Sequence, residues 1–381
     1  MQLSSVQIHL PESVRGFSRT LSRAFPTPRL LAPPSAGIDI SDASVKWLAL
    51  ESAKKGNGLR VRSWGEIAIP EGVVVGGFVH DKEGLVSILA AVKKELRGIE
   101  CAHAALPEEA AYVFSMQVPP GSRRAQILSL IEFELEARVP IPPSAAVYDF
   151  NLIEKNGAGE EIGVVVFPRD ISESYAAAFA AADLPLASLE LEASSIARAI
   201  SSREGADPIT LLVDFGRTRS GFAVLKRGIP IFTSTVSIGG GTVIKAIMEK
   251  LSLSEAEAMK FNNEQGIAPE GGAKSPGAEA VAGAAAALAD EVARHYHYWD
   301  TRRNEHGERM TPVEQVYLLG GTSNMKGITD YIAGRVQAPT DQPNVWKNVA
   351  DFDDYVPPIT YRESLQYATA VGLALRGVSL I

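Results

Sequence analysis

Gly37-Ile38-Asp39-Ile40-Ser41-Asp42-Ala43-Ser44-Val45-Lys46 and Leu211-Leu212-Val213-Asp214-Phe215-Gly216-Arg217-Thr218-Arg219-Ser220 are the two stretches that decide the fold of this 381-residue chain. Each is an apolar strand that ends in an Asp and continues through a tight turn of small and hydroxyl residues into a second strand. Such a hairpin points backbone N–H groups and hydroxyls at one place, which suits a phosphate. The neighbouring Asp can hold Mg²⁺, usually through water. Two copies about 175 residues apart predict two lobes with a nucleotide between them.

A third stretch, from Val316 to Gly327, predicts a buried strand, a glycine turn and a helix that starts at Ile328. Glycines at such a turn let a flat ring or a phosphate approach the backbone closely. Taken alone, the stretch is equally typical of an ordinary strand–helix turn. After two phosphate hairpins, it is the expected position of an adenosine site.

From Gly37 onward the chain resembles the actin-like ATPase superfamily and, within it, the PilM family of type IV pilus assembly proteins. The segments that carry the resemblance keep the family's order and spacing: 37–50, 131–142, 147–150, 189–193, 237–241, 254–260 and 367–376. The resemblance implies an α/β fold of the actin-like (ribonuclease H-like) type, with two lobes, an ATPase cleft between them and an inserted SHS2-type α+β subdomain.

The expected domain organisation follows from this resemblance. Residues 1–36 form an N-terminal extension with a Pro-rich linker, 37–207 the first lobe and 208–362 the second lobe. The inserted subdomain is expected at about 111–185. A helical subdomain of the second lobe is expected at about 247–312, and a C-terminal helix at 363–381 returns to the first lobe.

Hydrophobic periodicity and turn residues predict the finer elements. Two separate strands are expected at 59–63 and 66–69. A helix is expected from Ser122 to Arg138, with Ser122 as its N-cap. Residues 268–280 read as a loop, and a long helix is expected from Ala282 to about Glu305.

Composition bounds the function. The chain is 46% hydrophobic, which is ample for cores, and no apolar run approaches the roughly 20 residues that a bilayer needs. Cys101 is the only cysteine, so no internal disulfide is expected. The net charge of −8 argues against non-specific nucleic-acid binding. Composition therefore predicts a cytoplasmic globular protein with no nucleic-acid partner. The resemblance to the PilM family implies, in addition, a location peripheral to the inner membrane.

The N-terminal extension is basic, in contrast to the rest of the chain. Residues 13–25 read as an amphipathic helix with Arg15, Arg19 and Arg23 on one face and apolar side chains on the other. Such a helix suits peripheral contact with an anionic membrane. A disordered tail, or a helix docked on this protein or a partner, explains the pattern as well. PilM proteins usually begin close to the first phosphate motif, so the resemblance says nothing about this segment.

The resemblance assigns roles in an ATP·Mg²⁺ site. Asp39 and Asp214 would orient Mg²⁺ and its waters, and Glu192 would position the attacking water, with Glu190 as the alternative. A turn-capping role is the structural alternative for each Asp. Lys46 either reaches the phosphates or is a solvated strand lysine. The remaining expected nucleotide contacts are Ser41, Ser44, Gly216, Thr218, Ser220, Gly239, Gly240, Gly320, Gly321, Thr322 and Met325.

Three residues depart from the family's phosphate motifs. Ser41 stands where the first motif usually has Gly, and its Cβ could crowd the phosphates. Arg217 and Arg219 stand where the second motif usually has small residues, and they could neutralise phosphates or point to solvent. These departures favour ATP binding over efficient turnover, so at most a slow ATPase is expected.

Three functions remain open at this point. The first is a PilM-like scaffold of a type IV pilus or related secretion machine, which binds ATP and recruits the cytoplasmic tail of a PilN-like inner-membrane protein. The second is an FtsA-like, self-associating filament or cell-division protein. The third is a phosphotransferase of the sugar-kinase type, for which we find no convincing motif supplying the substrate-side Asp.

Overall fold

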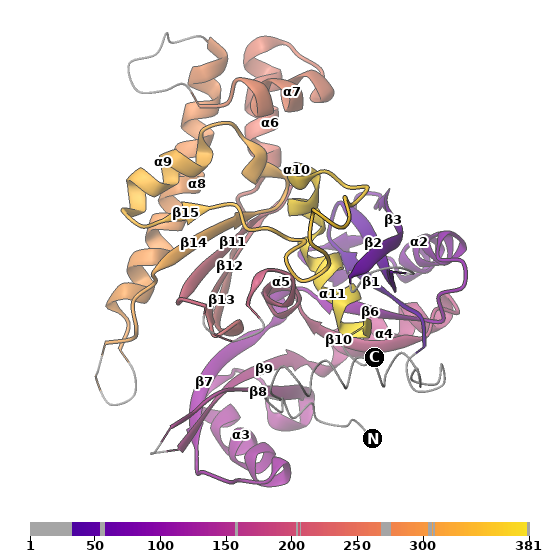
Figure 1. The fold of residues 1–381 in the computed structure, drawn as a ribbon, viewed down its shortest axis with the longest axis vertical. Coiled ribbons are helices and arrows are strands. Elements are labelled where there is room, and N and C mark those ends of the chain that lie inside the picture. Colours follow the sequence, from indigo (N-terminus) through magenta and orange to yellow (C-terminus); the bar gives the residue numbers. More distant parts are fainter. Residues whose placement is uncertain are drawn as a thin grey trace.

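The computed structural model describes residues 33–53, 58–156, 159–202, 205, 207–267, 276–303, 307 and 309–378. The N-terminal extension up to residue 32, with its expected helix at 13–25, lies outside the described residues, as do residues 268–275 of the expected loop. Two five-stranded sheets and one three-stranded sheet form the framework (Figure 1). Among the described residues, none of the helices is both long and apolar enough to cross a membrane.

The first sheet has the strand order β10-β6-β1-β2-β3. Its central strand, β1, pairs antiparallel with β2, as the first phosphate hairpin predicts, and it also pairs parallel with β6. The strands are β1 (Ser35–Ile40), β2 (Ser44–Ser52), β3 (Leu59–Ala68), β6 (Cys101–Leu106) and β10 (Leu186–Leu191).

The prediction of two strands at 59–63 and 66–69 is wrong, because β3 is continuous. Its pairing with β2 runs through Trp64 and Gly65. Gly65 does not break the strand but makes room for the Trp47 ring, which a Cβ at this position would strike. The glycine therefore serves packing here and not a turn.

Four helices cover the first sheet: α2 (Lys82–Glu95), α4 (Arg169–Ala181), α5 (Glu192–Ile200) and α11 (Ala368–Val378). The C-terminal helix packs against β1 and α5. It approaches α5 so closely that a Cβ at Gly372 would collide with the Ser195 carbonyl. The expected single helix is interrupted, since α10 (Tyr361–Ser364) and a 3₁₀ turn at Leu365–Tyr367 precede α11.

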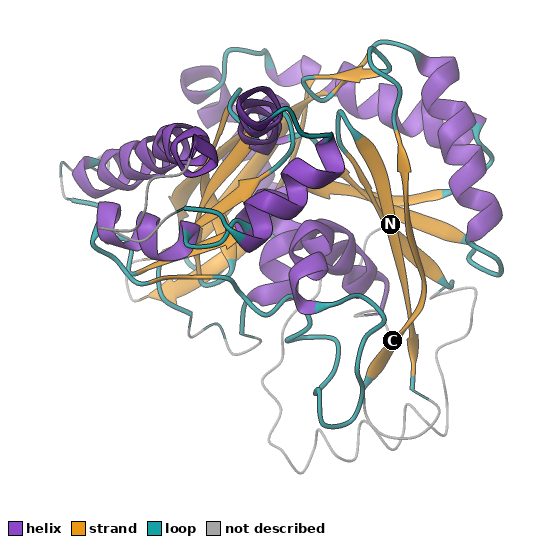
Figure 2. Cartoon of the chain, turned by 90° about the horizontal axis from the view of Figure 1, so that it is seen from above, coloured by secondary structure: helices purple, strands orange, loops and turns teal. Residues whose placement is uncertain are grey.

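The second sheet repeats the same plan, with the order β13-β12-β11-β14-β15 and the second phosphate hairpin at its centre. Its strands are β11 (Thr210–Phe215), β12 (Ser220–Lys226), β13 (Ile229–Val236), β14 (Gln315–Leu319) and β15 (Thr340–Asp341). Its helices are α6 (Gly240–Leu251), α7 (Glu255–Glu264), α8 (Pro276–Thr301) and α9 (Ile328–Val336). Figure 2 shows the strands of the two large sheets as separate groups with helices around them.

The long helix α8 starts at Pro276 and not at Ala282, so the expected loop at 268–280 is wrong over its last residues. Proline fits the first turn of a helix, where its missing N–H is not needed. The small residues that follow it, among them Ala282, continue the helix without a break.

The three-stranded sheet has the order β7-β9-β8 and carries α3 on one face. Its elements are β7 (Tyr112–Val118), α3 (Arg124–Arg138), β8 (Ala146–Asn156) and β9 (Gly159–Pro168). Ser122 is not the N-cap of α3, which Arg123 occupies. The Ser122 hydroxyl instead donates to the Pro119 carbonyl at 2.7 Å, inside the preceding turn.

This small sheet has a core of its own, which includes Phe114, Ile131 and Val164. Helix α4 does not share that core, because Tyr175 and Phe179 are buried with the first sheet. The unit also contacts the second sheet. Lys226, at the end of β12, forms ion pairs with Glu154 (2.9 Å) and Glu161 (2.6 Å) of the β8–β9 hairpin.

The contact between α11 and α5 gives a stability prediction. Replacing Gly372 with Ala should lower the free energy of unfolding by about 1–3 kcal/mol, because the added methyl overpacks a closed helix contact. Urea unfolding followed by circular dichroism measures this. The control is Gly334→Ala in α9, where a Cβ meets nothing within 4 Å and helix propensity favours Ala. Equal effects of the two substitutions would contradict the packing described here.

Candidate functional site

The carboxyl ends of β1 and β11 place two aspartates at one cavity between the large sheets. Asp39 and Asp214 both line this cavity, whose volume is about 80 Å³. Burial raises the pKa of Asp39, although Lys46 opposes the shift. Burial, with the Asp39 charge, raises the pKa of Asp214 to about 6. The aspartates therefore carry the signature of carboxylates held close together in a poorly hydrated place.

Glu192 is a third acidic residue at this cavity. It is the first residue of α5, it lines the same cavity, and burial and the Asp39 charge raise its pKa well above the usual value. Glu190, the alternative, faces elsewhere and forms ion pairs with Arg198 and Arg376 at 2.5 Å each. Burial opposes its ionisation, but these arginines lower the pKa of Glu190 overall.

Glu108 and Glu109 are site residues that the sequence analysis missed. They follow β6, the parallel neighbour of β1, and both line the cavity. Oε1 of Glu108 accepts the Ala193 N–H at 3.0 Å, at the start of α5. Burial raises the pKa of Glu108 to about 8, helped by the charges of Asp214 and Glu109. Two acidic residues directly after a buried strand of the central sheet were the available signal.

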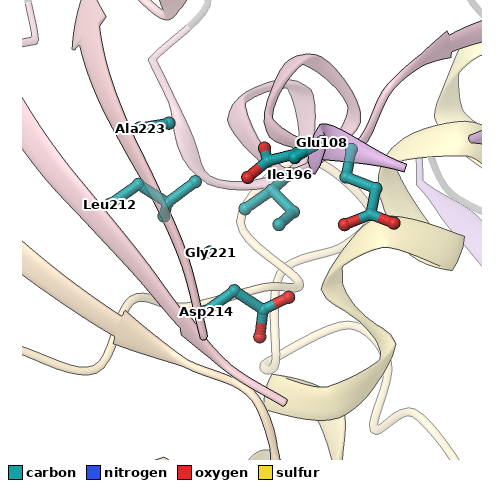
Figure 3. A pocket seen from close by; sticks show the side chains of 7 residues that line it. Glu108, Ile196, Leu212, Asp214, Gly221 and Ala223 are labelled. Carbon is teal, nitrogen blue, oxygen red and sulfur yellow. The ribbon is translucent and has the colours of Figure 1, made fainter. Parts of the chain in front are cut away.

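A smaller pocket of about 10 Å³ lies beside the main cavity, and Figure 3 shows the side chains around it. Glu108, Glu192 and Asp214 contribute carboxylates, while Ile196 and Leu212 supply an apolar wall. This volume approaches the space that one water molecule occupies, and three carboxyl groups offer it polar partners.

The hydroxyls of the two phosphate turns have different surroundings. Ser41 and Thr218 line the cavity. The Ser41 hydroxyl also donates to the Ser44 carbonyl at 3.0 Å, within its own turn. Ser44 and Ser220 are buried and do not line the cavity; Ser220 donates to the Ile238 carbonyl at 2.6 Å. Lys46 is no solvated lysine, because its ammonium contacts Ser44 (2.9 Å) and Glu66 (3.2 Å).

The glycines of the turn at 237–241 and the residues expected at the adenosine site, between 320 and 325, do not line the cavity. Gly320 has a φ of 80°, and a Cβ there would strike the Phe215 carbonyl. Gly240 touches Thr322, and its N–H donates to the Gly216 carbonyl at 2.9 Å. Of the predicted glycines, Gly216 lines the cavity, whereas Gly239, Gly240, Gly320 and Gly321 do not. Met325 is 2% exposed and belongs to the core of the second sheet.

The two arginines of the second turn differ. Arg217, 62% exposed, pairs with Glu255 of α7 at 2.6 Å. Arg219 is 16% exposed; its Nη1 contacts both carboxylate oxygens of Asp42 at 3.0 Å and its Nε contacts Glu109. Arg219 therefore joins the second phosphate turn to the first.

The residues present fit part of a Mg²⁺–nucleotide complex. Within the described ranges there is no group of three or more His, Cys, Asp or Glu side chains that could hold a metal ion. Asp39 and Asp214 would hold Mg²⁺ through its waters, as carboxylates beside bound phosphates usually do. Gly320 adds nothing to this fit, because the space beside it is filled by the Phe215 carbonyl and the Asp214 carboxylate. A cavity of about 80 Å³ is smaller than the several hundred Å³ typical of ligand pockets, so a whole nucleotide requires the lobes to separate.

The buried acid Glu108 gives a pH prediction. Its folded pKa of about 8 lies above the usual 4.5, so the folded state binds an extra proton between these values. Stability should therefore fall as pH rises from 4.5 to 8. In Glu108→Gln, the decline of Tm between pH 6 and pH 9 should be smaller than in the wild type, as differential scanning fluorimetry can test.

Glu160→Gln is the control, since Glu160 is as little exposed as Glu108 but lies near the surface, where its hydrogen bond with Lys155 lowers its pKa. This control should keep the decline of the wild type. Parallel curves for Glu108→Gln and the wild type would show that Glu108 does not hold the proton.

Comparison with solved structures confirms the predicted fold class. The chain is similar to the "PilM-PilN type IV pilus biogenesis complex", with a TM-score of 0.74 and 19% identity over 91% of this chain and 99% of that one. The ethanolamine utilization protein EutJ from Carboxydothermus hydrogenoformans matches with a TM-score of 0.52 and 15% identity, over 90% of this chain and 89% of that one. MreB5 of Spiroplasma citri bound to ADP matches with a TM-score of 0.51 and 12% identity, over 92% and 98%. The fold is that of the actin-like ATPases.

The curated proteins contain no matching sequence. The family model described as type IV pilus assembly protein PilM matches residues 37–378, which covers both large sheets and the unit between them. The chain therefore belongs to the PilM family of type IV pilus assembly proteins.

Proposed function

We propose that this chain is a nucleotide-controlled scaffold of type IV pilus assembly, which binds ATP·Mg²⁺ between its lobes and recruits the cytoplasmic tail of a PilN-like inner-membrane protein. The observation that carries the proposal is the convergence of Asp39, Glu192 and Asp214 from two sheets on one cavity. A ligand that contacts all three elements stabilises one arrangement of the lobes over others.

The charge of the cleft supports binding of a cation together with the nucleotide. Five carboxylates and two arginines line the cavity, the partly buried Arg219 and the exposed Arg217; the five carboxylates are those of Asp39, Glu108, Glu109, Glu192 and Asp214. Phosphates alone would be repelled, whereas hydrated Mg²⁺ would neutralise both groups of anions. MreB5 of Spiroplasma citri is bound to ADP in its crystal structure, which is consistent with a nucleotide in a cleft of this fold.

The same crowding of acids is the reason to propose slow turnover. Bound Mg²⁺ would supply charge neutralisation for phosphoryl transfer. Glu192 is the residue placed to orient a water, but four more carboxylates line the same cavity and repel the phosphates on which that water would act. A switch that holds its nucleotide suits a scaffold better than rapid hydrolysis does.

The partner proposal rests on the PilM family and on the likeness to the structure of a PilM–PilN complex. We place the peptide near the inserted α+β unit, as an extended segment. The ion pairs of Lys226 connect that unit to the second sheet. A movement of the second lobe would therefore alter the surroundings of the proposed peptide site. Binding to such a partner would hold the protein at the cytoplasmic face of the inner membrane. Membrane contact through residues 13–25 and self-association are separate possibilities that this scheme does not require.

We also propose domain limits that fit the cores. The first lobe ends near residue 207 and the second near 362, with the helical subdomain at about 247–312. The inserted unit spans 112–168 and not 111–185, since α4 packs with the first sheet. The C-terminal helix belongs to the first lobe.

Calorimetry with ATP and Mg²⁺ tests the cleft. The wild type should bind, and Asp39→Ala combined with Asp214→Ala should weaken binding by at least about tenfold, because the cation loses both anchoring carboxylates. Asp330→Ala, an exposed aspartate on α9, is the control and should bind as the wild type does. Unchanged binding by the double variant would rule out this cleft as the nucleotide site.

A peptide experiment tests the partner. A synthetic peptide with the sequence of the N-terminal cytoplasmic tail of the same organism's PilN-like protein should bind the full chain in fluorescence anisotropy, and its affinity should change when ATP·Mg²⁺ is added. A scrambled peptide of equal composition is the control. Equal anisotropy with both peptides, with and without nucleotide, would refute the recruitment proposal.

A further inference from the structure

The two phosphate turns are joined by a network of charges that the predicted site did not include. Arg219, in the β11–β12 turn, contacts Asp42 in the β1–β2 turn and Glu109 after β6. The three side chains are only 16%, 15% and 20% exposed, so solvent screens this network less than a surface ion pair. The network lies at the cavity, which Arg219 and Glu109 both line.

Asp42 is held in place without Arg219. Its Oδ2 accepts the Gly76 N–H at 3.1 Å, and its Oδ1 accepts the Gly77 N–H at 3.0 Å, in the turn between β4 (Val74–Val75) and β5 (Phe78–Val79). Both glycines have positive φ values, of 59° and 78°, which this turn requires. The Gly77 carbonyl in turn accepts the Tyr175 hydroxyl at 2.8 Å. Asp42 therefore keeps hydrogen-bond partners when the guanidinium leaves, and the exchange does not strand its charge.

The partners of Arg219 have the chemistry of phosphate. A guanidinium binds carboxylate and phosphate oxygens through the same planar set of donors. Arg219 shares the cavity with Asp39, Ser41 and Thr218, where the two phosphate turns meet. Asp42 and Glu109 thus present anionic oxygens to Arg219 at the place where nucleotide phosphates would lie.

We propose that Arg219 is a phosphate-binding residue of the cleft, and that Asp42 and Glu109 are its competitors, which occupy the guanidinium until the terminal phosphates of a nucleoside triphosphate take it over. This inference rests on the proposed binding of ATP in the same cleft. According to this inference, Asp42 and Glu109 weaken nucleotide binding. A purely structural role or a cation-binding role of these carboxylates would not have that effect.

The sign of the effect follows from competition. Removing the charge of Asp42 or of Glu109 frees Arg219 and removes a repelling anion, so ATP should bind more tightly. Removing Arg219 leaves both carboxylates and takes away the attractive group, so ATP should bind more weakly. If Asp42 and Glu109 only maintained the fold of the turns, their loss would weaken binding as well.

Calorimetry with ATP and Mg²⁺ on the full chain separates these cases. We expect Asp42→Asn and Glu109→Gln each to bind at least about fivefold more tightly than the wild type, and Arg219→Gln to bind about tenfold more weakly, in the range of single charged hydrogen bonds. The control is Arg335→Gln, which removes a surface ion pair with Asp290 far from the cleft and should leave affinity unchanged.

A nucleotide-free measurement shows whether the network exists in solution. Urea unfolding of Arg219→Gln, Asp42→Asn and the double variant should reveal coupling between the two residues, as a double-mutant cycle measures it. Absence of coupling would overturn the inference whatever the nucleotide results are.

The outcomes also separate this inference from the proposed function. If the wild type binds ATP but Asp42→Asn and Glu109→Gln bind it equally or more weakly, the competition is refuted and the nucleotide site stands. Unchanged affinity in Arg219→Gln would likewise refute the role of the arginine. If no protein in the series binds ATP, the nucleotide site and the inference both fail.

Discussion

The meeting of buried carboxylates between the two large sheets is the constraint on which the rest of the structure depends. Each sheet has a central strand that ends in an Asp, and the sheets face each other so that Asp39 and Asp214 reach one cavity. Carboxylates in such a place repel one another and lose hydration, which raises their pKa values. The arrangement is tolerable because Arg219 and Lys46 lie close by, and a bound cation would relieve it further.

The inserted α+β unit is connected to both large sheets. It follows β6 of the first sheet in the chain, yet Lys226 attaches it to the second sheet. Glu108 and Glu109 occupy the link between β6 and this unit, directly beside the cavity. A structural change in the cleft would therefore be transmitted through Glu108 and Glu109 to the surface where we place the partner peptide.

Much of this fold could be predicted from the sequence. The paired hairpins and the third glycine turn are local patterns, and their chain order fixes how the central strands are arranged. The local signal for Glu108 and Glu109, two acidic residues after a buried strand, does not by itself place them at a cavity. Their role depends on β6 lying beside β1 and on α5 presenting the Ala193 N–H.

Other differences between expectation and structure have a similar cause. Ser44 and Ser220 were expected to contact the nucleotide, but both are buried and do not line the cavity. The Ser44 hydroxyl accepts a hydrogen bond from the Lys46 ammonium, and the Ser220 hydroxyl donates one to the Ile238 carbonyl. The expected break between residues 63 and 66 does not occur, because Gly65 continues the strand and leaves room for the Trp47 ring. Helix α4 belongs to the first sheet because its apolar face meets α2 and β10, a contact that periodicity alone does not reveal.

The central claim is that this acidic cleft binds a nucleotide only together with a divalent cation. The most direct test is the affinity of the wild-type chain for ATP, measured by calorimetry across a series of Mg²⁺ concentrations that ends in excess EDTA. The account predicts that affinity falls by at least about tenfold when Mg²⁺ is removed, since the phosphates then meet unneutralised carboxylates. Equal affinity with and without Mg²⁺, or no binding at any Mg²⁺ concentration, would contradict it.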